Sequence, residues 1–296
     1  MKSRRQSRLQ SAMEYLMTYG WTILAIAIVM VSLYSLGIFN LQSLAPTATP
    51  GSCQVIKTAA QTGLAGQCDN MVPKYVGQFN GGNSLVSTPT SRMPSVANPN
   101  FTYSTWTEFP NVPSGSGVLF YGTIDFVGGS SQFLCGYIEN GQNVFMCAGQ
   151  GNGYPQINFN TPSANTWYNY VVTYNGVMLT AYVNGKLVAG PTTATVSINP
   201  ITNLYIGKTS PWFSGSGYMY GQIANVQIYN ASLDNTTIKK LYQEGIGGAP
   251  IILNSLVGWW PLNGNANDYS GNNNQGAATN VTWNANWRSS YISPTT

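Results

Sequence analysis

The sequence predicts an N-terminal transmembrane α-helix joined to an all-β outer domain, a two-sheet sandwich with one short helix. Three observations predict this class. An apolar run without charge lies between Glu14 and Lys57, strand-like runs recur between turn residues after residue 74, and charged residues make up only 7% of the chain. Gly, Asn, Ser, Thr and Tyr are abundant, as is typical of a sandwich with many turns.

The formal charge of +4 comes from the N-terminus. Lys2, Arg4, Arg5 and Arg8 supply four of the twelve basic residues, and the eight acidic residues balance the basic residues that remain. A protein that binds nucleic acid needs a clustered basic surface, which the rest of this chain lacks. Nucleic acid is therefore excluded as a partner.

The apolar run Gly20 to Phe39 has the length of roughly 20 residues that crosses a bilayer as a helix. Because the basic residues precede it, the positive-inside rule puts the N-terminus in the cytoplasm and the C-terminus outside the cell, which makes the chain membrane-anchored with an extracellular domain. We expect four parts: a basic leader (1–9), an apolar helix (10–42), a linker with a disulfide loop (43–73) and a β-domain (74–296).

A motif in front of the apolar run is QSAME, residues 10–14. With basic residues before it and the helix after it, it resembles the class III signal of archaeal type IV pilins. The resemblance implies that a prepilin peptidase cuts between Leu9 and Gln10, and that the helix assembles a homopolymer in a surface filament. Glu14 would pair with the new α-amine, since an unpaired acid is costly in lipid. The family usually has Gly where Leu9 stands, and the alternative is an uncleaved signal anchor.

The chain has four cysteines and no histidine, which excludes Ser-His chemistry and imidazole ligands for metals. Cys135 and Cys147 flank Asn140-Gly141, a hairpin-turn signal that brings them close to facing positions on two strands. Cys53 and Cys68 enclose a second loop. Two disulfides fit an oxidising location outside the cytoplasm. Four cysteines allow three pairings, and four free buried thiols are the alternative.

Strand-like runs and turns alternate through the β-domain. The clearest are Trp167 to Tyr174 and Met178 to Val183, which Asn175-Gly176 joins as a hairpin. Asp234 is the expected N-cap of a helix from Asn235 to Glu244, and Gly245 is expected to end it. The other expected strands are Phe101 to Trp106, Val118 to Phe126, Phe133 to Ile138, Asn143 to Cys147, Leu204 to Gly207 and Gln222 to Tyr229.

The segments KYVGQFNGGNSLV, FTYSTW, WYNYVVTYNGVMLTAYVNGKLV, NLYIG and GQIANVQIYNASLDNTTIKKLY occur in an order similar to that of laminin-G-like domains, which are concanavalin-A-like jelly rolls. The resemblance covers residues 74–283 and implies a jelly-roll sandwich. Residues 256–276 also resemble this family, in which such a strand usually opens the domain. We therefore expect a circularly permuted sandwich, with Leu256 to Leu262 buried in cis. Donation of this strand to a neighbouring subunit is the alternative.

Some jelly rolls of this superfamily are glycoside hydrolases, which hold two carboxylates roughly 5–10 Å apart. None of the eight acids of this chain lies two to five residues from another on an expected strand. We therefore expect no enzymatic activity. The alternatives are a membrane-anchored glycoside hydrolase that uses Glu108 or Glu139, and a purely structural surface scaffold.

Carbohydrate binding without cleavage needs aromatic rings with amides or hydroxyls on loops. Four aromatic residues in Gly/Ser-rich loops are the candidate platform for carbohydrate or another surface polymer: Tyr154, Trp212, Phe213 and Tyr218. Packing of these rings against the rim of the sandwich is the alternative. The sequence thus predicts a surface-displayed protein for adhesion or recognition.

Two further sets of residues are candidate sites. Asn265, Asn267 and Asp268 lie in an oxygen-rich loop that is a weak calcium candidate, because it has one carboxylate. Its alternative is an Asx-turn loop bonded to its own backbone. Sequons make three asparagines candidates for glycosylation: Asn100, Asn230 and Asn280.

Overall fold

The structure is a computed structural model. It describes Met17 and residues 19–33, 46–69, 71–89, 99–110, 120–128, 131–138, 144–149, 156–159, 162–196, 201–209 and 217–294. Residues Met1–Ala45 and Pro46–Thr296 form two compact units, and each is considered by itself.

The described part of the N-terminal unit is helical at Met17 and over residues 19–33. Its large apolar side chains from Tyr19 to Val31 are 49–70% exposed. None of the helices within the described residues has both the length and the hydropathy of a membrane span. Leu9, Gln10 and Glu14, the residues expected to direct processing and assembly, lie outside the described residues.

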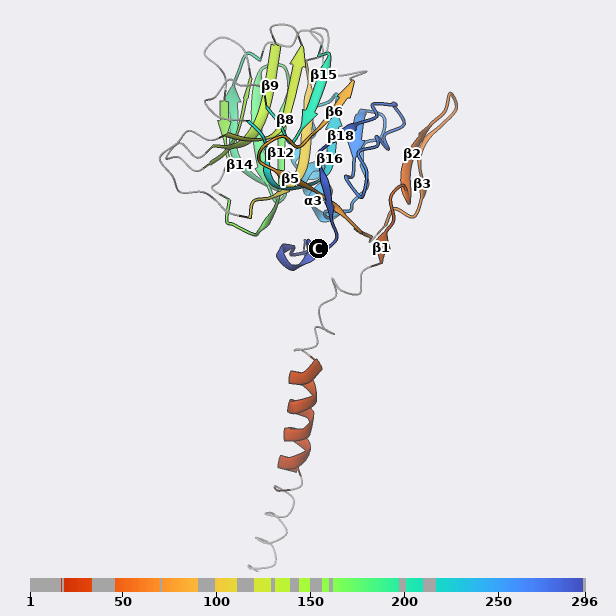
Figure 1. The fold of residues 1–296 in the computed structure, drawn as a ribbon, viewed down its shortest axis with the longest axis vertical. Coiled ribbons are helices and arrows are strands. Elements are labelled where there is room, and N and C mark those ends of the chain that lie inside the picture. The colour runs from red at the N-terminus through yellow and green to blue at the C-terminus, as the bar shows by residue number, and fades with distance from the viewer. Residues whose placement is uncertain are drawn as a thin grey trace, which may run out of the picture. The chain divides into compact units, whose positions relative to one another are not determined.

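The second unit contains a seven-stranded antiparallel sheet. Figure 1 shows β9, β8, β15 and β6 side by side in this sheet. Its strand order is β11 (Gln156–Asn158), β10 (Val144–Gly149), β9 (Ser131–Ile138), β8 (Phe120–Gly128), β15 (Asn203–Ile206), β6 (Leu85–Pro89) and β18 (Ala277–Thr279).

An eight-stranded sheet packs against the first. Its strand order is β14 (Lys186–Thr193), β13 (Met178–Val183), β12 (Trp167–Tyr174), β7 (Phe101–Glu108), β16 (Tyr220–Tyr229), β5 (Val76–Asn80) and β19 (Thr282–Asn284), and β17 (Leu256–Trp260) pairs with β16. The bounds of β12 and β13 are those that the sequence predicts. The expected all-β jelly-roll sandwich is confirmed.

The core between the sheets is aromatic. Alternate residues of each strand enter it, as the period of two along a strand requires, and Tyr103, Ile124 and Tyr170 are among its buried members. The ring of Phe145 stacks on that of Tyr170 with centroids 3.8 Å apart. Such pairs stabilise a core beyond the effect of their buried area.

The outer face of the eight-stranded sheet is also covered. The helix α3 (Asn235–Gln243) packs Ile238 and Leu241 onto Val171 of this face. Asp234 caps the helix by accepting a hydrogen bond from the Thr237 backbone N–H at 2.8 Å, as expected. Gly245, at φ +78°, follows the end of the helix in the conformation that favours glycine. Beyond α3, the turn η1 (Arg288–Ser290) belongs to a C-terminal segment that covers Trp106.

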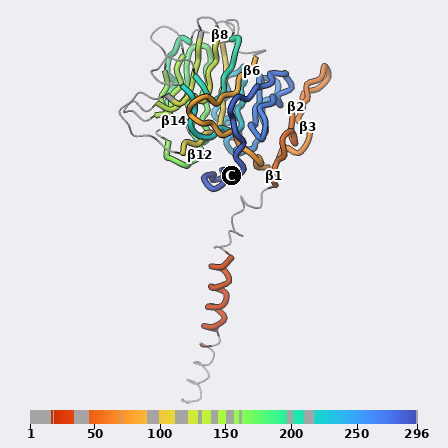
Figure 2. Tube along the Cα trace, viewed as in Figure 1, coloured from red at the N-terminus to blue at the C-terminus, as the bar shows by residue number. Residues whose placement is uncertain are grey.

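The C-terminal segment returns to its own domain. All five residues of β17 are buried, and four of them pair with residues of β16, while β18 pairs with β6 and β19 with β5. Figure 2 shows this segment beside the N-terminal strands of the sandwich. The expectation that this segment completes its own sandwich in cis is therefore confirmed, including the burial of Leu262, while the circular permutation relative to the family stays a prediction.

Two small sheets precede the sandwich. β1 (Thr47–Ala48) pairs with β4 (Val72–Pro73), and β2 (Cys53–Lys57) pairs with β3 (Thr62–Gly66) as a hairpin. The disulfide Cys53–Cys68 closes the base of this hairpin. An isolated two-stranded hairpin is only marginally stable in water. The disulfide and the packing of Val55 in a cluster with Trp259 therefore stabilise this hairpin. The sequence predicts a disulfide loop in this region but no strands.

Candidate functional site

A cluster of aromatic and cationic side chains lies on the outer face of the seven-stranded sheet. Tyr205 of β15 and Tyr218 are half-buried, and the Lys208 ammonium lies 5.5 Å and 5.3 Å from the centres of their rings. Both distances are within the range of cation–π attraction. No carboxylate among the described residues forms an ion pair with Lys208. We call Tyr205, Lys208 and Tyr218 the outer-face cluster.

Local backbone geometry brings the members of the cluster together. Gly207 has φ +79°, a conformation that favours glycine, and the chain turns there before Lys208 pairs with Tyr218. The Thr209 N–H donates to the Gly217 carbonyl at 2.9 Å, which closes the base of the connection between them. Gly122 of β8 permits this approach, because a Cβ there would lie 2.3 Å from the Thr209 methyl group.

A buried carboxylate lies on the same face. Asp125 of β8 stands opposite Tyr205 in the sheet, and side chains of directly opposed residues share a face. The Gln132 side-chain amide donates to both Asp125 oxygens at 2.9 Å, and Asp125 is fully buried. The described polar groups of this face thus include the buried hydrogen-bonded pair of Asp125 and Gln132 and the half-exposed Lys208 cation between two rings.

The structure brings one of the four expected aromatic residues to this face. Tyr218 belongs to the outer-face cluster, whereas Tyr154, Trp212 and Phe213 lie outside the described residues, and their role stays a prediction. Sequence reasoning missed Tyr205, Lys208, Asp125 and Gln132. A signal for Lys208 was present, because it follows a strand and Gly207 in a chain with few charges.

The oxygen-rich loop near the C-terminus is bonded internally. The Asp268 carboxylate accepts from the backbone N–H groups of Trp259, Ser270 and Asn274 and from the Ser270 hydroxyl, at 2.8–3.0 Å. Asn265 exchanges hydrogen bonds with Tyr269 and accepts from the Asn267 N–H. These bonds occupy the lone pairs that calcium would need. The geometry therefore favours the Asx-turn alternative for Asn265, Asn267 and Asp268. No cluster of three acidic, cysteine or histidine ligands occurs in the part of the chain that the structure describes.

The described strand carboxylates do not form a pair of the hydrolase kind. Glu108 lies on the outer face of the eight-stranded sheet, opposite Trp167 and Gln222, whereas Asp125 lies on the outer face of the other sheet. Sheets stack about 10 Å apart, so the two carboxylates point away from each other across the whole sandwich. Glu139 lies outside the described residues.

The buried carboxyl of Glu108 should make the stability of the domain depend on pH. Burial raises the pKa of its carboxyl above the ordinary value, and the Gln222 amide, which donates at 2.8 Å, offsets only part of this. The folded state then holds the proton more tightly than the unfolded state. We expect the free energy of unfolding to fall as pH rises from the unfolded pKa of Glu108 through its folded pKa.

Urea unfolding of Glu108→Gln and of the wild type at about pH 4 and pH 7 measures this effect. The variant should match the wild type at the lower pH and exceed it in stability at the higher pH. Asp69→Asn, which changes an exposed carboxyl, is the matched control. An identical pH dependence for Glu108→Gln and the wild type would contradict the account.

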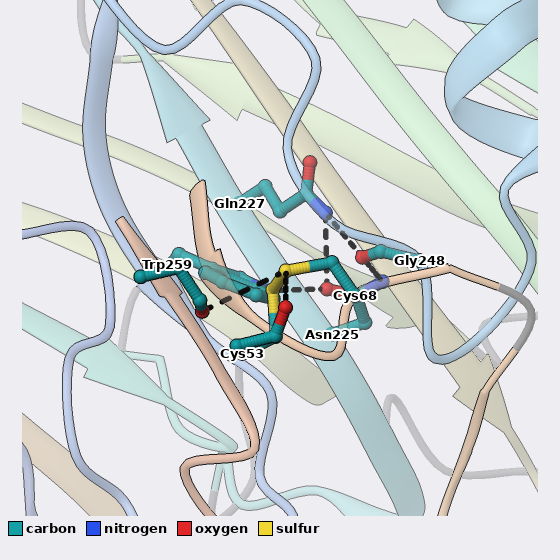
Figure 3. Close-up of a disulfide and its surroundings, with 8 residues drawn as sticks. Cys53, Cys68, Asn225, Gln227, Gly248 and Trp259 are labelled. Carbon is teal, nitrogen blue, oxygen red and sulfur yellow. Dashed lines mark hydrogen bonds between the residues drawn. A yellow bond between two sulfur atoms is a disulfide. The ribbon is translucent and has the colours of Figure 1, made fainter. Parts of the chain in front are cut away.

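Both expected disulfides are present. Cys135 and Cys147 are directly opposed on β9 and β10 and fully buried, which confirms the pairing that the turn signal indicated. Cys53–Cys68 is half-buried beside β16 and β17 (Figure 3). The free-thiol alternative is wrong for all four. Of the sequon asparagines, Asn280 is exposed, and Asn100 and Asn230 are half-buried, so glycosylation stays a prediction.

The two packed sheets define a jelly-roll domain. The model of the concanavalin A-like lectin/glucanases superfamily matches residues 80–239, more than half of the chain, and the chain belongs to this family. The expectation from the laminin-G-like resemblance is thereby confirmed. No curated protein sequence matches the chain.

Solved structures share the fold at low identity. A candidate carbohydrate-binding protein from Bacteroides ovatus is 16% identical with a TM-score of 0.53, and the match covers 77% of this chain and 65% of that one. A heptameric SAP-like pentraxin from Limulus polyphemus is 13% identical with a TM-score of 0.47, over 71% and 94% of the two chains. The chain thus spans about two thirds of the Bacteroides protein, and this likeness shows the fold alone.

Proposed function

We propose that this protein recognises acidic carbohydrates through the outer-face cluster and displays that site at the cell surface. The single observation that carries the proposal is the Lys208 ammonium, held between the rings of Tyr205 and Tyr218 with no carboxylate paired to it among the described residues. A fold hosts many functions, so the proposal rests on these side chains rather than on the family.

The chemistry of the cluster suits an acidic sugar. Half-exposed tyrosine rings present apolar faces on which the C–H face of a pyranose ring packs, and their hydroxyls offer hydrogen bonds at the edge. A lysine ammonium bonds strongly to a carboxylate or sulfate, because both partners carry charge. Partial burial between the rings reduces the screening of this attraction by water and salt. The cluster therefore favours a uronate, a sialic acid or a sulfated sugar over a neutral one.

The test removes the charge and keeps the side-chain stem. Lys208→Met should weaken binding to polygalacturonate by about 10-fold to 100-fold, since a hydrogen bond to a charged group contributes ~1.5–3 kcal/mol. Lys186→Met, on the exposed edge strand β14, is the matched control and should bind like the wild type. Methyl-esterified polygalacturonate, which lacks the charge, should bind weakly to all three proteins. Equal binding of the acidic polymer by Lys208→Met and the wild type would contradict the proposed site.

The proposal also concerns how the domain is displayed. The apolar N-terminal helix would hold the protein in the membrane with the β-domain outside, and assembly of processed chains would place it in a pilin-like filament. The exposed apolar side chains of residues 19–33 support a lipid or protein environment for this helix, and the two disulfides support an oxidising location.

N-terminal sequencing of the protein from the cell surface separates the two modes of display. A chain that begins at Gln10 supports processing by a prepilin peptidase and assembly through the helix. A chain that retains Lys2 contradicts the processed-pilin mode and leaves an uncleaved anchor. Recovery of the native chain only from the detergent-free intracellular fraction would contradict both modes.

A further inference from the structure

The two disulfides differ in how far solvent can reach them. Cys135 and Cys147 are fully buried in the core between the sheets. Cys53 and Cys68 are half-buried, and they pack at the margin of the buried cluster that contains Trp259. Both chain neighbours of Cys68 are exposed. A thiol in solution can therefore approach the Cys53–Cys68 bridge, whereas the fold shields the Cys135–Cys147 bridge from it.

A small recess opens beside the accessible bridge. Both of its cysteines line the recess, and Ser52, Asn225 and Trp259 are among the other lining residues. Figure 3 shows the bridge next to Asn225 and Trp259. The recess has a volume of about 30 Å³, enough for roughly two water molecules. The bridge therefore borders a space that water can enter.

The hairpin that this bridge closes is attached to the C-terminal segment. The Val55 N–H donates to the Tyr269 carbonyl at 2.8 Å, and the Val55 side chain is 4% exposed in a cluster with Leu256. The Lys57 ammonium donates to the Leu256 carbonyl at 2.8 Å and to Asn272 Oδ1 at 3.1 Å. These contacts join β2 to residues 256–272, within the segment that completes the sandwich.

The bridge limits how far the hairpin can open. Its two cysteines are 15 positions apart in the chain. A cross-link over a loop of this length restricts the open chain and so favours the closed hairpin by about 100-fold. Without the bridge, a two-stranded hairpin is only marginally stable. Cleavage of the bridge should therefore allow β2 to separate from Tyr269 and Leu256.

We propose that the Cys53–Cys68 bridge is a site of thiol–disulfide exchange with a dithiol, and that its reduction releases the hairpin from the C-terminal segment. A thiolate of the dithiol attacks the sulfur of Cys68, forms a mixed disulfide and expels Cys53 as a thiolate. The second thiol then attacks the mixed disulfide and expels Cys68. Two electrons pass from the dithiol to the bridge, its two protons end on the cysteines, and the dithiol becomes a disulfide.

The hairpin favours a dithiol over a monothiol. Cys53 pairs with Gly66 in the ladder, and the Gln67 N–H donates to the Ser52 carbonyl at 2.8 Å, so the backbone holds the two cysteines together until the hairpin opens. The expelled Cys53 thiolate can therefore attack the mixed disulfide at high effective concentration and close the bridge again. A second thiol on the same reductant competes with this reclosure, because its attack is also intramolecular.

Thiol trapping on the folded full chain in detergent tests the exchange site. Dithiothreitol is added, free thiols are alkylated with iodoacetamide, and mass spectrometry reads each cysteine. Cys53 and Cys68 should react at least about 1,000-fold faster than Cys135 and Cys147, since a buried bridge is open only in the unfolded fraction of about 10⁻³ or less. In urea all four should react. 2-Mercaptoethanol at the same thiol concentration should leave the Cys53–Cys68 bridge mostly closed.

Hydrogen exchange on the same chain measures release of the C-terminal segment. Reduction should accelerate amide exchange in residues 53–66, by up to about 100-fold, and in residues 256–272, and should leave β12 unchanged. The double variant Cys53→Ser/Cys68→Ser should behave like the reduced chain and ignore dithiothreitol. Val55→Ser keeps the bridge and removes the buried contact, so it should accelerate exchange in residues 256–272. Ile56→Ser, at a side chain that is 45% exposed, is the matched control and should behave like the wild type.

Four results would overturn the proposal: a Cys53–Cys68 bridge that dithiothreitol cuts only in urea, both bridges cut at one rate, equal reduction by the monothiol, or unchanged exchange in residues 256–272 after reduction. Loss of protection in β12 as well would also contradict it, because the bridge would then stabilise the whole domain rather than the hairpin. Reduction of this bridge alone, with faster exchange confined to the hairpin and residues 256–272, would support it.

Discussion

A chain that ends at Asn254 should fail to fold. The truncation removes β17, whose five residues are buried, together with β18 and β19, which pair with β6 and β5. Removal of a buried Trp side chain alone costs ~3–5 kcal/mol, and the segment contributes Trp259, Trp260 and Trp287 to the buried set. Their sum approaches or exceeds the total stability of about 5–15 kcal/mol that is usual for a domain.

The measurement is thermal unfolding followed by near-ultraviolet circular dichroism. The truncated chain should show no cooperative transition, whereas a chain that ends at Pro294 should unfold like the full chain. Sedimentation of the chain without its N-terminal helix should give a monomer, because the C-terminal segment completes the sheet of its own domain. A folded truncated chain, or a dimer that depends on residues 255–294, would contradict closure of the sandwich in cis.

Asp268→Asn should destabilise the domain by about 2–4 kcal/mol. The carboxylate accepts four hydrogen bonds that hold the loop after β17, two at each oxygen. The amide of the Asp268→Asn variant would replace one carboxylate oxygen by an N–H₂ group, which cannot accept a hydrogen bond. In either orientation this group faces at least one backbone N–H, and each donor left without an acceptor costs ~1–3 kcal/mol. The side chain is 7% exposed, so water cannot restore these bonds.

Urea unfolding of the variant gives this free energy, with the exposed Asp69→Asn as the control, which should remain within about 0.5 kcal/mol of the wild type. Millimolar calcium should leave the unfolding midpoint of the wild type unchanged. A calcium-dependent rise that Asp268→Asn abolishes would restore the calcium interpretation of this loop and contradict the hydrogen-bond account.

The sequence predicts most of the strands, because their signals are local. The alternation in WYNYVVTY and the Asn-Gly turn after it determine β12 and β13 to the residue. The same reasoning missed β3, whose TGLAG sequence has two glycines and no alternation, since its strand is held by pairing with β2 and by the disulfide. The irregularity at Asn225 is also invisible in QIANVQIY, because it depends on Trp259, 34 residues later.

The candidate sites were harder to predict, because they depend on which strands become neighbours. Glu108 and Asp125 are both strand carboxylates in the sequence, and only the pairing of the strands separates them to opposite outer faces. Tyr205 and Lys208 flank a glycine turn, and Tyr218 joins them through a single bridge across the sheet. The aromatic residues in the loops identified Tyr218, and with it this region of the sheet, but they did not indicate that Lys208 lies beside it.

A glycan array probed with the full chain tests the central claim most directly, namely that the outer-face cluster selects acidic sugars. The array should hold matched pairs of glycans with and without a uronate, sialic acid or sulfate. The account predicts that the strongest signals come from the charged member of a pair and that Lys208→Met removes this preference. Signals from neutral glycans only, or a charge preference that Lys208→Met leaves intact, would contradict it.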